Sequence, residues 1–207
     1  MSNWINHPLV LEGERVKLVP LHQDHFPELV AIAKRREIWE HLPIAGQEEK
    51  ELVQTLGTAL LKRAYGEQYP FTAIDKRTGN VFGSTRLFEI FPEHKKLEIG
   101  WTWYHPDYWG TGHNLECKLL LLTYCFETLR TNRVQLKTRD VNLRSQAAIR
   151  KIGAVQEGIL RKDRVMPDGT VRDTVVFSIL NDEWSRVKQH LQTIISTTYQ
   201  AGGINKV

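Results

Sequence analysis

A glycine-rich window between an alternating segment and a long apolar segment holds the residues best suited to binding chemistry. It covers residues 105–114 and reads His105-Pro-Asp-Tyr-Trp-Gly-Thr-Gly-His-Asn114. Glycines in a tight turn expose consecutive backbone N–H groups, and the start of the following helix adds about half a positive charge. Together they form an anion site suited to a pyrophosphate. The window has neither the Gly-Lys-Ser/Thr ending of a triphosphate-binding loop nor the Gly-x-Gly-x-x-Gly spacing of a dinucleotide fold, so it predicts another phosphate-bearing ligand.

The histidines and cysteines predict neither a metal site nor a disulfide. His22 and His25 are three residues apart, but no Glu or Cys completes a zinc-binding set with them. On one helix, Cys117 and Cys125 would lie about 12 Å apart along the axis, whereas a disulfide needs Cα atoms within about 7 Å. We therefore expect no metal and two buried structural thiols, which suit a reducing compartment.

Length and composition are those of an ordinary globular protein. The 207 residues are 41% hydrophobic and 25% charged, which predicts a single domain with its core over about 12–190. The longest apolar run, residues 119–122, is far shorter than the roughly 20 residues of a membrane span, and no secretory signal opens the chain, so we expect a cytoplasmic protein. The net charge of +4 is scattered rather than clustered, which argues against nucleic-acid and membrane partners.

The hydrophobic pattern predicts an α/β fold with a mixed sheet and helices on both faces. The expected strands cover residues 16–21, 69–75, 81–89, 97–104, 133–138, 155–161 and 171–180. The expected helices cover residues 24–40, with Asp24 as the cap, and 48–64, 114–130, 142–152 and 183–195. The order is β-α-α-β-β-β-α-β-α-β-β with a C-terminal helix, and residues 196–207 are expected to form a flexible tail.

One expected strand alternates cleanly between two faces. Its apolar face holds Leu97, Ile99, Trp101 and Trp103, and its other face holds Glu98, Gly100, Thr102 and Tyr104.

Three stretches follow one another in a recognisable order. They are Glu98-Ile-Gly-Trp101, then Trp109-Gly-Thr-Gly-His-Asn114 with Leu115-Glu-Cys-Lys-Leu119, then residues 142–154. Together they resemble the GNAT N-acetyltransferases, most closely the ribosomal-protein-alanine acetyltransferase branch, whose closing hairpin is similar to Asp168-Gly169 and residues 172–180. The resemblance covers about 12–190. It departs from the usual Gln/Arg-x-x-Gly-x-Gly/Ala phosphate motif, because Trp109 and Asn114 hold the outer positions and only the central Gly112 matches.

The resemblance implies a GNAT-like fold and an activity. Acetyl-CoA would be the co-substrate, and its acetyl group would move directly to a primary amine in a ternary complex, without a metal. Protein N-termini, aminoglycosides, polyamines and amino acids all remain open as acceptors, and the branch favours a peptide α-amine. The chain would be a monomer or a homodimer. The alternative is a non-catalytic acyl-CoA-binding regulatory module on the same fold.

The resemblance also implies a set of donor-binding residues. The backbone of Ile99, Gly100 and Trp101 would pair with pantetheine as an added strand, and its N–H groups would polarise the thioester carbonyl. Gly100 would equally suit a bulge. The phosphates and the rest of the cofactor would meet Trp109, Gly110, Thr111, Gly112, His113, Asn114 and Asn142. His113 is equally suited to an ordinary loop position, and Asn142 to a helix cap.

Two residues are implied to be catalytic. Glu98 would act as general base on the amine, directly or through water, with a surface salt bridge as the alternative. Ser145 would protonate the departing thiolate, and Tyr104 and Tyr108 are competing hydroxyl donors. The acceptor is expected between residues 26–45 and 161–172, with Trp39, Trp101, Trp103 and Trp109 as its walls or as core.

Overall fold

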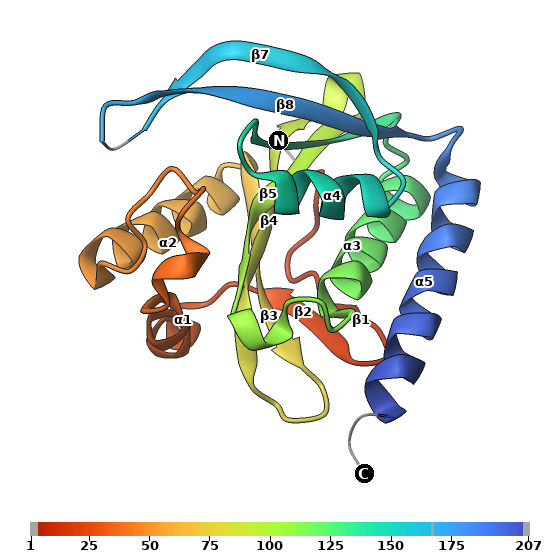
Figure 1. The fold of residues 1–207 in the computed structure, drawn as a ribbon, viewed down its shortest axis with the longest axis horizontal. Coiled ribbons are helices and arrows are strands. Elements are labelled where there is room, and N and C mark those ends of the chain that lie inside the picture. Colours follow the sequence, from red (N-terminus) through yellow and green to blue (C-terminus); the bar gives the residue numbers. More distant parts are fainter. Residues whose placement is uncertain (1–3, 167, 205–207) are drawn as a thin grey trace.

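An eight-stranded mixed sheet forms the centre of the computed structural model, which describes residues 4–166 and 168–204 (Figure 1). Its strand order is β1-β2-β3-β4-β5-β6-β8-β7, and every neighbouring pair is antiparallel except the parallel pair β5–β6. The strands are β1 Leu11–Glu12, β2 Val16–Pro20, β3 Gln68–Asp75, β4 Val81–Phe91, β5 Lys96–Tyr104, β6 Arg133–Arg139, β7 Val155–Val165 and β8 Val171–Leu180. The α/β class is confirmed, and β1 is an additional short strand that the sequence did not predict.

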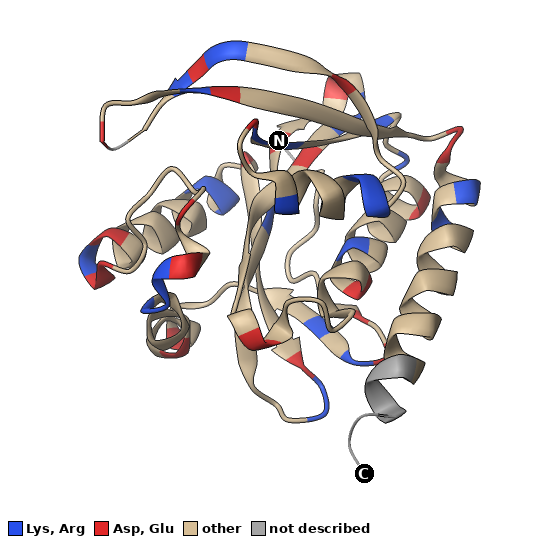
Figure 2. Cartoon of the chain, viewed as in Figure 1, with Lys and Arg blue, Asp and Glu red and all other residues tan. Residues whose placement is uncertain are grey.

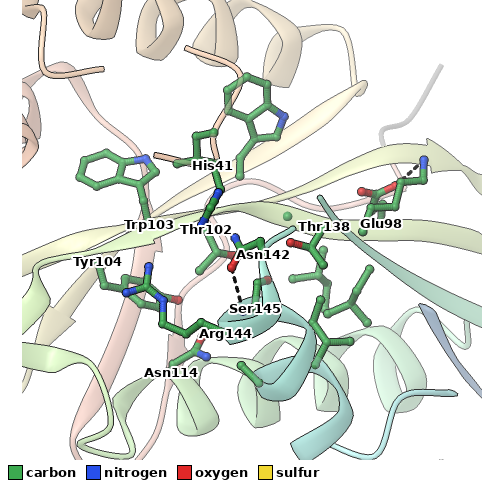
Figure 3. A pocket seen from close by; sticks show the side chains of 18 of the residues that line it. His41, Glu98, Thr102, Trp103, Tyr104, Asn114, Thr138, Asn142, Arg144 and Ser145 are labelled. Carbon is green, nitrogen blue, oxygen red and sulfur yellow. Dashed lines mark hydrogen bonds and ion pairs between the residues drawn. The ribbon is translucent and has the colours of Figure 1, made fainter. Parts of the chain in front are cut away.

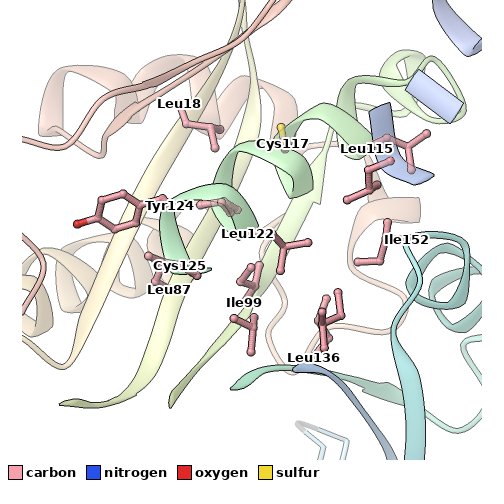
Figure 4. Close-up of a cluster of buried hydrophobic side chains, with 14 of the residues drawn as sticks. Leu18, Leu87, Ile99, Leu115, Cys117, Leu122, Tyr124, Cys125, Leu136 and Ile152 are labelled. Atoms are coloured by element: carbon pink, nitrogen blue, oxygen red, sulfur yellow. The ribbon is translucent and has the colours of Figure 1, made fainter. Parts of the chain in front are cut away.

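Helices cover both faces of this sheet (Figure 1). They are α1 Phe26–Ala33, α2 Glu49–Ala64, α3 His113–Thr123, α4 Leu143–Lys151 and α5 Trp184–Ile204. Helices α1 and α2 pack on one face around Leu29, Leu52 and Leu56. The larger core on the other face joins α3, α4 and α5 to the strands; Figure 4 shows Leu18, Leu87, Ile99, Leu122, Leu136 and Ile152 within it.

The two cysteines lie in this larger core, as predicted. Both thiols are free and fully buried on the helical segment of α3 and the π-helical turn Tyr124–Thr128 that extends it. Burial raises the pKa of Cys117 to about 12. A thiol held protonated in this way is an inert packing group.

The first predicted helix is shorter than expected. A 3-10 turn, Gln23–His25, precedes α1, and the side chain that caps it belongs to His22 rather than Asp24. Helix α1 ends at Ala33, where the indole N–H of Trp39 donates to the Ala33 carbonyl at 2.7 Å. The buried Trp39 indole thus donates to the Ala33 carbonyl, which would otherwise accept the next backbone hydrogen bond of a longer helix.

The prediction of a flexible tail from residue 196 was wrong, because α5 continues to Ile204. Tyr199 is buried there, and its hydroxyl donates to the carboxylate of Glu116 on α3. The guanidinium of Arg15 lies 3.7 Å from the centre of the Tyr199 ring. These tertiary contacts stabilise a segment of weak helix formers. Residues 205–207 lie outside the described part of the chain.

A bulge interrupts the predicted alternation of β5. Arg86 of β4 pairs with Gly100 and Ser84 pairs with Trp103, so one residue of β4 faces two residues of β5. Trp101, one of these two, has a left-handed φ of 50°. Because of this extra residue, the side chains of β5 that follow it point to the opposite face of the sheet from the one that strict alternation predicts. Leu97, Ile99 and Tyr104 therefore share the larger core, while Trp103 packs with α1 and α2.

Strands β5 and β6 diverge soon after they begin. Their pairing runs only from Lys96–Arg133 to Glu98–Gln135. Beyond Glu98, the edge of β5 that faces β6 has no strand partner among the described residues. Within the same residues, no helix is both long and apolar enough to cross a membrane.

Candidate active site

A cavity of about 350 Å³ opens where β5 and β6 diverge (Figure 3). Its walls come from β5, the glycine-rich turn (residues 105–112, before α3), α3, β6, α4, the β7–β8 hairpin and the connection between α1 and α2. A volume above about 300 Å³ is that of a small-molecule or cofactor site. The segments are far apart in the sequence, so only the fold brings them together.

The unpaired edge of β5 forms one wall. Ile99, Gly100 and Trp101, whose backbone the resemblance implied would pair with a strand-like ligand, all line the cavity. The bulge takes Trp101 out of the regular ladder with β4. A Cβ added at Gly100 would lie 2.7 Å from the Phe88 ring, so glycine is also needed there for packing.

The glycine-rich turn leads from β5 into α3. Gly110 and Gly112 have φ values of 76° and 94°, which L side chains rarely adopt. A Cβ at Gly112 would lie 2.6 Å from the ring of Tyr199, so α5 supports the turn from behind. Trp109, Gly110 and Asn114 line the cavity. The turn thus places free helix N–H groups at one end of the cavity.

Thr111 in this turn and His113 just after it have side chains that are engaged elsewhere. The Thr111 hydroxyl donates to the Tyr108 carbonyl at 2.8 Å and contacts His113 Nδ1 at 2.7 Å. The His113 ring packs against Phe82 and Tyr108, and its Nε2 lies 3.9 Å from Asp75. Burial lowers the pKa of His113, although Asp75 opposes the shift. Neither side chain is part of the cavity lining.

Glu98 lies on the cavity wall with only 4% of its surface exposed. Its Oε2 is 3.0 Å from Lys137 Nζ and accepts a hydrogen bond from Gln135 Nε2 at 2.9 Å. Its Oε1 receives no hydrogen bond from the described residues and lies beside Gly100, where an added Cβ would be 3.7 Å away. One carboxylate oxygen is therefore paired, and the other is left for a ligand or water.

The start of α4 forms the facing wall. The Asn142 side chain accepts a hydrogen bond from the Ser145 N–H at 3.0 Å, so Asn142 is the helix cap that the sequence predicted (Figure 3). Both residues line the cavity. Tyr104 lines it too, and burial raises the pKa of its hydroxyl well above the usual value. The Tyr108 hydroxyl instead donates to Asp75 at 3.2 Å, away from the cavity.

Three features fit the acetyl-CoA that the sequence implied. They are the unpaired strand edge, the left-handed glycine turn and the buried Oδ1 of Asn114, which finds no hydrogen-bond partner among the described residues. The amide groups of a pantetheine arm can pair with the strand edge and with Asn114 Oδ1, and a pyrophosphate suits the glycine turn.

Comparison with known proteins identifies the family. A family model described as "Acetyltransferase (GNAT) domain" matches residues 15–155. The chain belongs to the GNAT acetyltransferase family. The matched range includes β5, the glycine-rich turn and the whole of α4, which are the main walls of the cavity.

Individual GNAT relatives agree with this assignment. YdaF of Bacillus subtilis (strain 168), provisionally named a ribosomal N-acetyltransferase, is 33% identical over 110 residues, a match that covers 53% of this chain and 59% of YdaF. A crystal structure from T. thermophilus, provisionally described as an acetyltransferase, is 37% identical, with a TM-score of 0.80 over 91% of this chain and 98% of that one. Mycobacterium smegmatis RimJ, solved in complex with CoA-disulfide, has a TM-score of 0.79 over 91% of this chain and 95% of its own. At 18% identity, the RimJ match shows the shared fold alone.

This GNAT chain brings the predicted acceptor segments together. His41, Leu42 and Pro43 from the first segment line the same cavity as Arg164 and Arg172 from the second. Of the four predicted tryptophan walls, Trp101, Trp103 and Trp109 line the cavity. Trp39 is buried 5.1 Å from the Trp103 ring, as a core residue.

Several cavity residues of this GNAT domain were not singled out from its sequence. Lys118 on α3 is buried, donates from Nζ to the Thr102 hydroxyl at 3.0 Å, and has its pKa lowered to about 8 by burial. The Arg144 guanidinium lies 3.8 Å from the centre of the Trp109 ring. Lys118 carries a signal in hindsight, because it shares a helical face with Leu115 and Leu122, where a charge is unusual.

Proposed function

We propose that this chain transfers the acetyl group of acetyl-CoA to a primary amine, by direct attack in a ternary complex, and that the amine is the α-amine of a peptide or protein. The observation that carries the proposal is the unpaired β5 edge beside the glycine-rich turn in one cavity, with Glu98 and Ser145 on its walls. The proposal treats the chain as one catalytic domain, and it assigns the reaction to the cytoplasm because the two thiols are free.

The donor would lie along β5. Backbone groups of Ile99 and Gly100 would pair with the pantetheine amides, and the N–H of Trp101 would donate to the thioester carbonyl. A donor of this kind stabilises the negative charge that develops on the carbonyl oxygen when the amine attacks. The N–H groups at the start of α3 would hold the pyrophosphate.

Glu98 and Ser145 would handle the protons. The amine must lose a proton before or during its attack, and Glu98 Oε1 would accept it, directly or through water. The tetrahedral intermediate then collapses, its C–S bond breaks, and the Ser145 hydroxyl would donate a proton to the departing sulfur. Tyr104 is the alternative donor because it lines the same cavity.

The different basicities of α-amines and lysine amines favour an α-amine as acceptor. At pH 7 an α-amine with a pKa of about 8 is about 10% neutral, whereas a lysine amine at about 10.4 is only about 0.04% neutral. The α-amine therefore needs less help from the base. The provisional ribosomal name of YdaF supports a protein acceptor in the same direction.

The test combines binding with turnover. Isothermal titration should show one acetyl-CoA site, and thiol release with short peptides should require a free N-terminus. The same peptides with an acetylated N-terminus and an internal lysine are the matched control and should give no release. Tight acetyl-CoA binding without transfer to any amine would instead identify a non-catalytic acyl-CoA-binding module.

A further inference from the structure

The β7–β8 hairpin holds two positive charges directly opposite each other beside the cavity. Arg164 of β7 and Arg172 of β8 are cross-strand partners, and both line the cavity. Arg139 of β6 pairs with Thr174, which shares a face of β8 with Arg172. We call these three residues, Arg139, Arg164 and Arg172, the arginine cluster. Like charges in direct register destabilise a sheet, so folding stability does not account for the cluster.

The protein leaves much of the arginine cluster without partners. Nε of Arg139 and Nε of Arg172 are buried and have no hydrogen-bond partner among the described residues. The Arg139 guanidinium donates from Nη1 to the Glu40 carbonyl at 3.4 Å, which is a long contact. Burial, together with Arg164 and Arg139, lowers the pKa of Arg172, although Asp163 and Asp140 oppose the shift. Arg164 is exposed, whereas Arg139 and Arg172 are half-buried, and a partly buried cation gains from an anion that pairs with it.

Two of the nearby carboxylates are already engaged. Asp163 lies 3.6 Å from Arg164 Nε, and Asp173 accepts a hydrogen bond from the Lys162 N–H at 2.8 Å. Figure 2 shows the basic positions on both strands of this hairpin. Among the described residues that line the cavity, five cations face a single acid, Glu98; the cations are Lys118, Lys137, Arg144, Arg164 and Arg172. This excess of positive charge in the cavity lining favours an anionic ligand.

The position of the cluster identifies which ligand. The turn of the hairpin lies on the side of the connection between α1 and α2, well apart from the glycine-rich turn that would hold the pyrophosphate (Figure 1). His41 of that connection lines the cavity, and its Nδ1 is also buried without a partner among the described residues. The phosphates of the donor would thus occupy the other end, and the arginine cluster borders the acceptor side.

We propose that the acceptor carries carboxylates within a few residues of its reactive amine, as in an acidic peptide N-terminus, and that the arginine cluster binds them. This inference rests on the proposed function and names its substrate class. A guanidinium matches a carboxylate through two parallel N–H···O bonds, which the unpartnered Nε atoms have available. An acidic segment held there would direct its terminal amine toward Glu98 and the thioester.

The test compares two peptides of equal length and the same first residue, one continuing with three glutamates and the other with three glutamines. The wild type should have a KM about tenfold lower for the acidic peptide, and added salt should reduce this preference. Arg172→Gln and Arg164→Gln should each raise the KM of the acidic peptide about tenfold and leave that of the glutamine peptide within about twofold. Arg161→Gln, an exposed change on the same hairpin outside the cavity, should alter neither.

A second measurement separates binding from catalysis. In the presence of CoA, the N-acetylated acidic product should bind the wild type more tightly than it binds Arg172→Gln by titration calorimetry. Equal KM values for both peptides, or an Arg172→Gln effect of equal size on both, would overturn the inference and leave the acetyltransferase proposal standing. Transfer to no amine at all would overturn the proposed function itself, and the inference with it.

Discussion

Lys137 Nζ lies 3.0 Å from Glu98 Oε2, so an ion pair joins β5 and β6 just where the two strands diverge. Gln135 donates to the same carboxylate oxygen at 2.9 Å. The pair fixes the orientation of Glu98 and leaves Oε1 directed to the cavity side. Glu98, which is proposed as the base, therefore also links β5 to β6 at the opening of the cavity.

Breaking the pair from one side should destabilise the protein. Lys137→Met leaves the buried Glu98 carboxylate without its cation, which should lower the free energy of unfolding by about 2 kcal/mol. Adding Glu98→Gln removes the unpaired charge and should restore part of that loss. Urea denaturation of both single variants and the double variant measures the coupling energy. Additive effects of the two changes would show that the pair contributes nothing to stability.

Replacing the base should give a pH-dependent loss of activity. Glu98→Gln should lower kcat/KM for a peptide α-amine by about 10²-fold at pH 6.5. The loss should shrink as the pH rises through about 8, where an α-amine becomes neutral without help. Initial rates of thiol release from pH 6 to 9 measure the profile. The exposed Glu93→Gln, just before the same strand, is the control, and a pH-independent loss in Glu98→Gln would argue against a base.

The two polar residues at the start of α4 should separate into a catalytic and a structural role. Ser145→Ala should lower kcat about tenfold or more with little change in the KM for acetyl-CoA. Asn142→Ala removes the cap and should lower the free energy of unfolding by about 1 kcal/mol. Steady-state kinetics and thermal unfolding of both variants test this division. If Ser145→Ala keeps its full kcat, Tyr104→Phe should show the loss instead.

Two glycine-to-alanine changes should have opposite effects. At Gly112, a Cβ would meet the Tyr199 ring at 2.6 Å in a left-handed conformation, so Gly112→Ala should lower the free energy of unfolding by about 2 kcal/mol and weaken acetyl-CoA binding. At Gly57, inside α2, a Cβ would meet nothing within 4 Å, so Gly57→Ala should raise the free energy of unfolding by about 0.5–1 kcal/mol. Urea denaturation and acetyl-CoA titration of both variants test this prediction. If the two variants had the same stability and the same affinity for acetyl-CoA, α5 would not support the turn.

Lys118 should make stability depend on pH in the alkaline range. Burial lowers its pKa to about 8 from an ordinary value of 10.5, so between these values the unfolded chain binds more protons than the folded one. Stability therefore gains from a rising pH within this window, and the cost of burying the charge is fully present below pH 8. Lys118→Met should be more stable than the wild type by about 1–3 kcal/mol at pH 7.

The difference between wild type and Lys118→Met is the quantity to measure, because other groups titrate in both proteins. Urea denaturation at pH 7, 8, 9 and 10 should show this difference shrinking toward zero. A constant difference would mean that Lys118 is buried without a shifted pKa.

The sequence predicted the class of the fold and the site segments because both depend on local patterns. Apolar spacing placed most strands and helices, and the glycines around Thr111 marked the turn before α3. A bulge at Gly100 was one alternative from the sequence, but its effect on the faces of β5 was not predicted, because the residues alternate perfectly and only the register with β4 shows the extra residue after Gly100. The cross-strand pairing of Arg164 with Arg172 was not predicted either, because the register between two strands cannot be read from the sequence of one strand alone.

The end of α5 shows a different limit of local patterns. Ser196, Thr197 and Thr198 are weak helix formers, so propensity argued for a tail. What stabilises the helix there is Tyr199, through contacts with Glu116 and Arg15 that come from distant parts of the chain. Such contacts become visible only once the fold is known.

The support of the glycine-rich turn by Tyr199 has a consequence for how the protein matures during translation. Gly112 leaves the ribosome long before Tyr199 is synthesised, and until then nothing fills the space behind the turn. A chain truncated before residue 196 should therefore keep all strands of the sheet but have a loose cofactor-binding end.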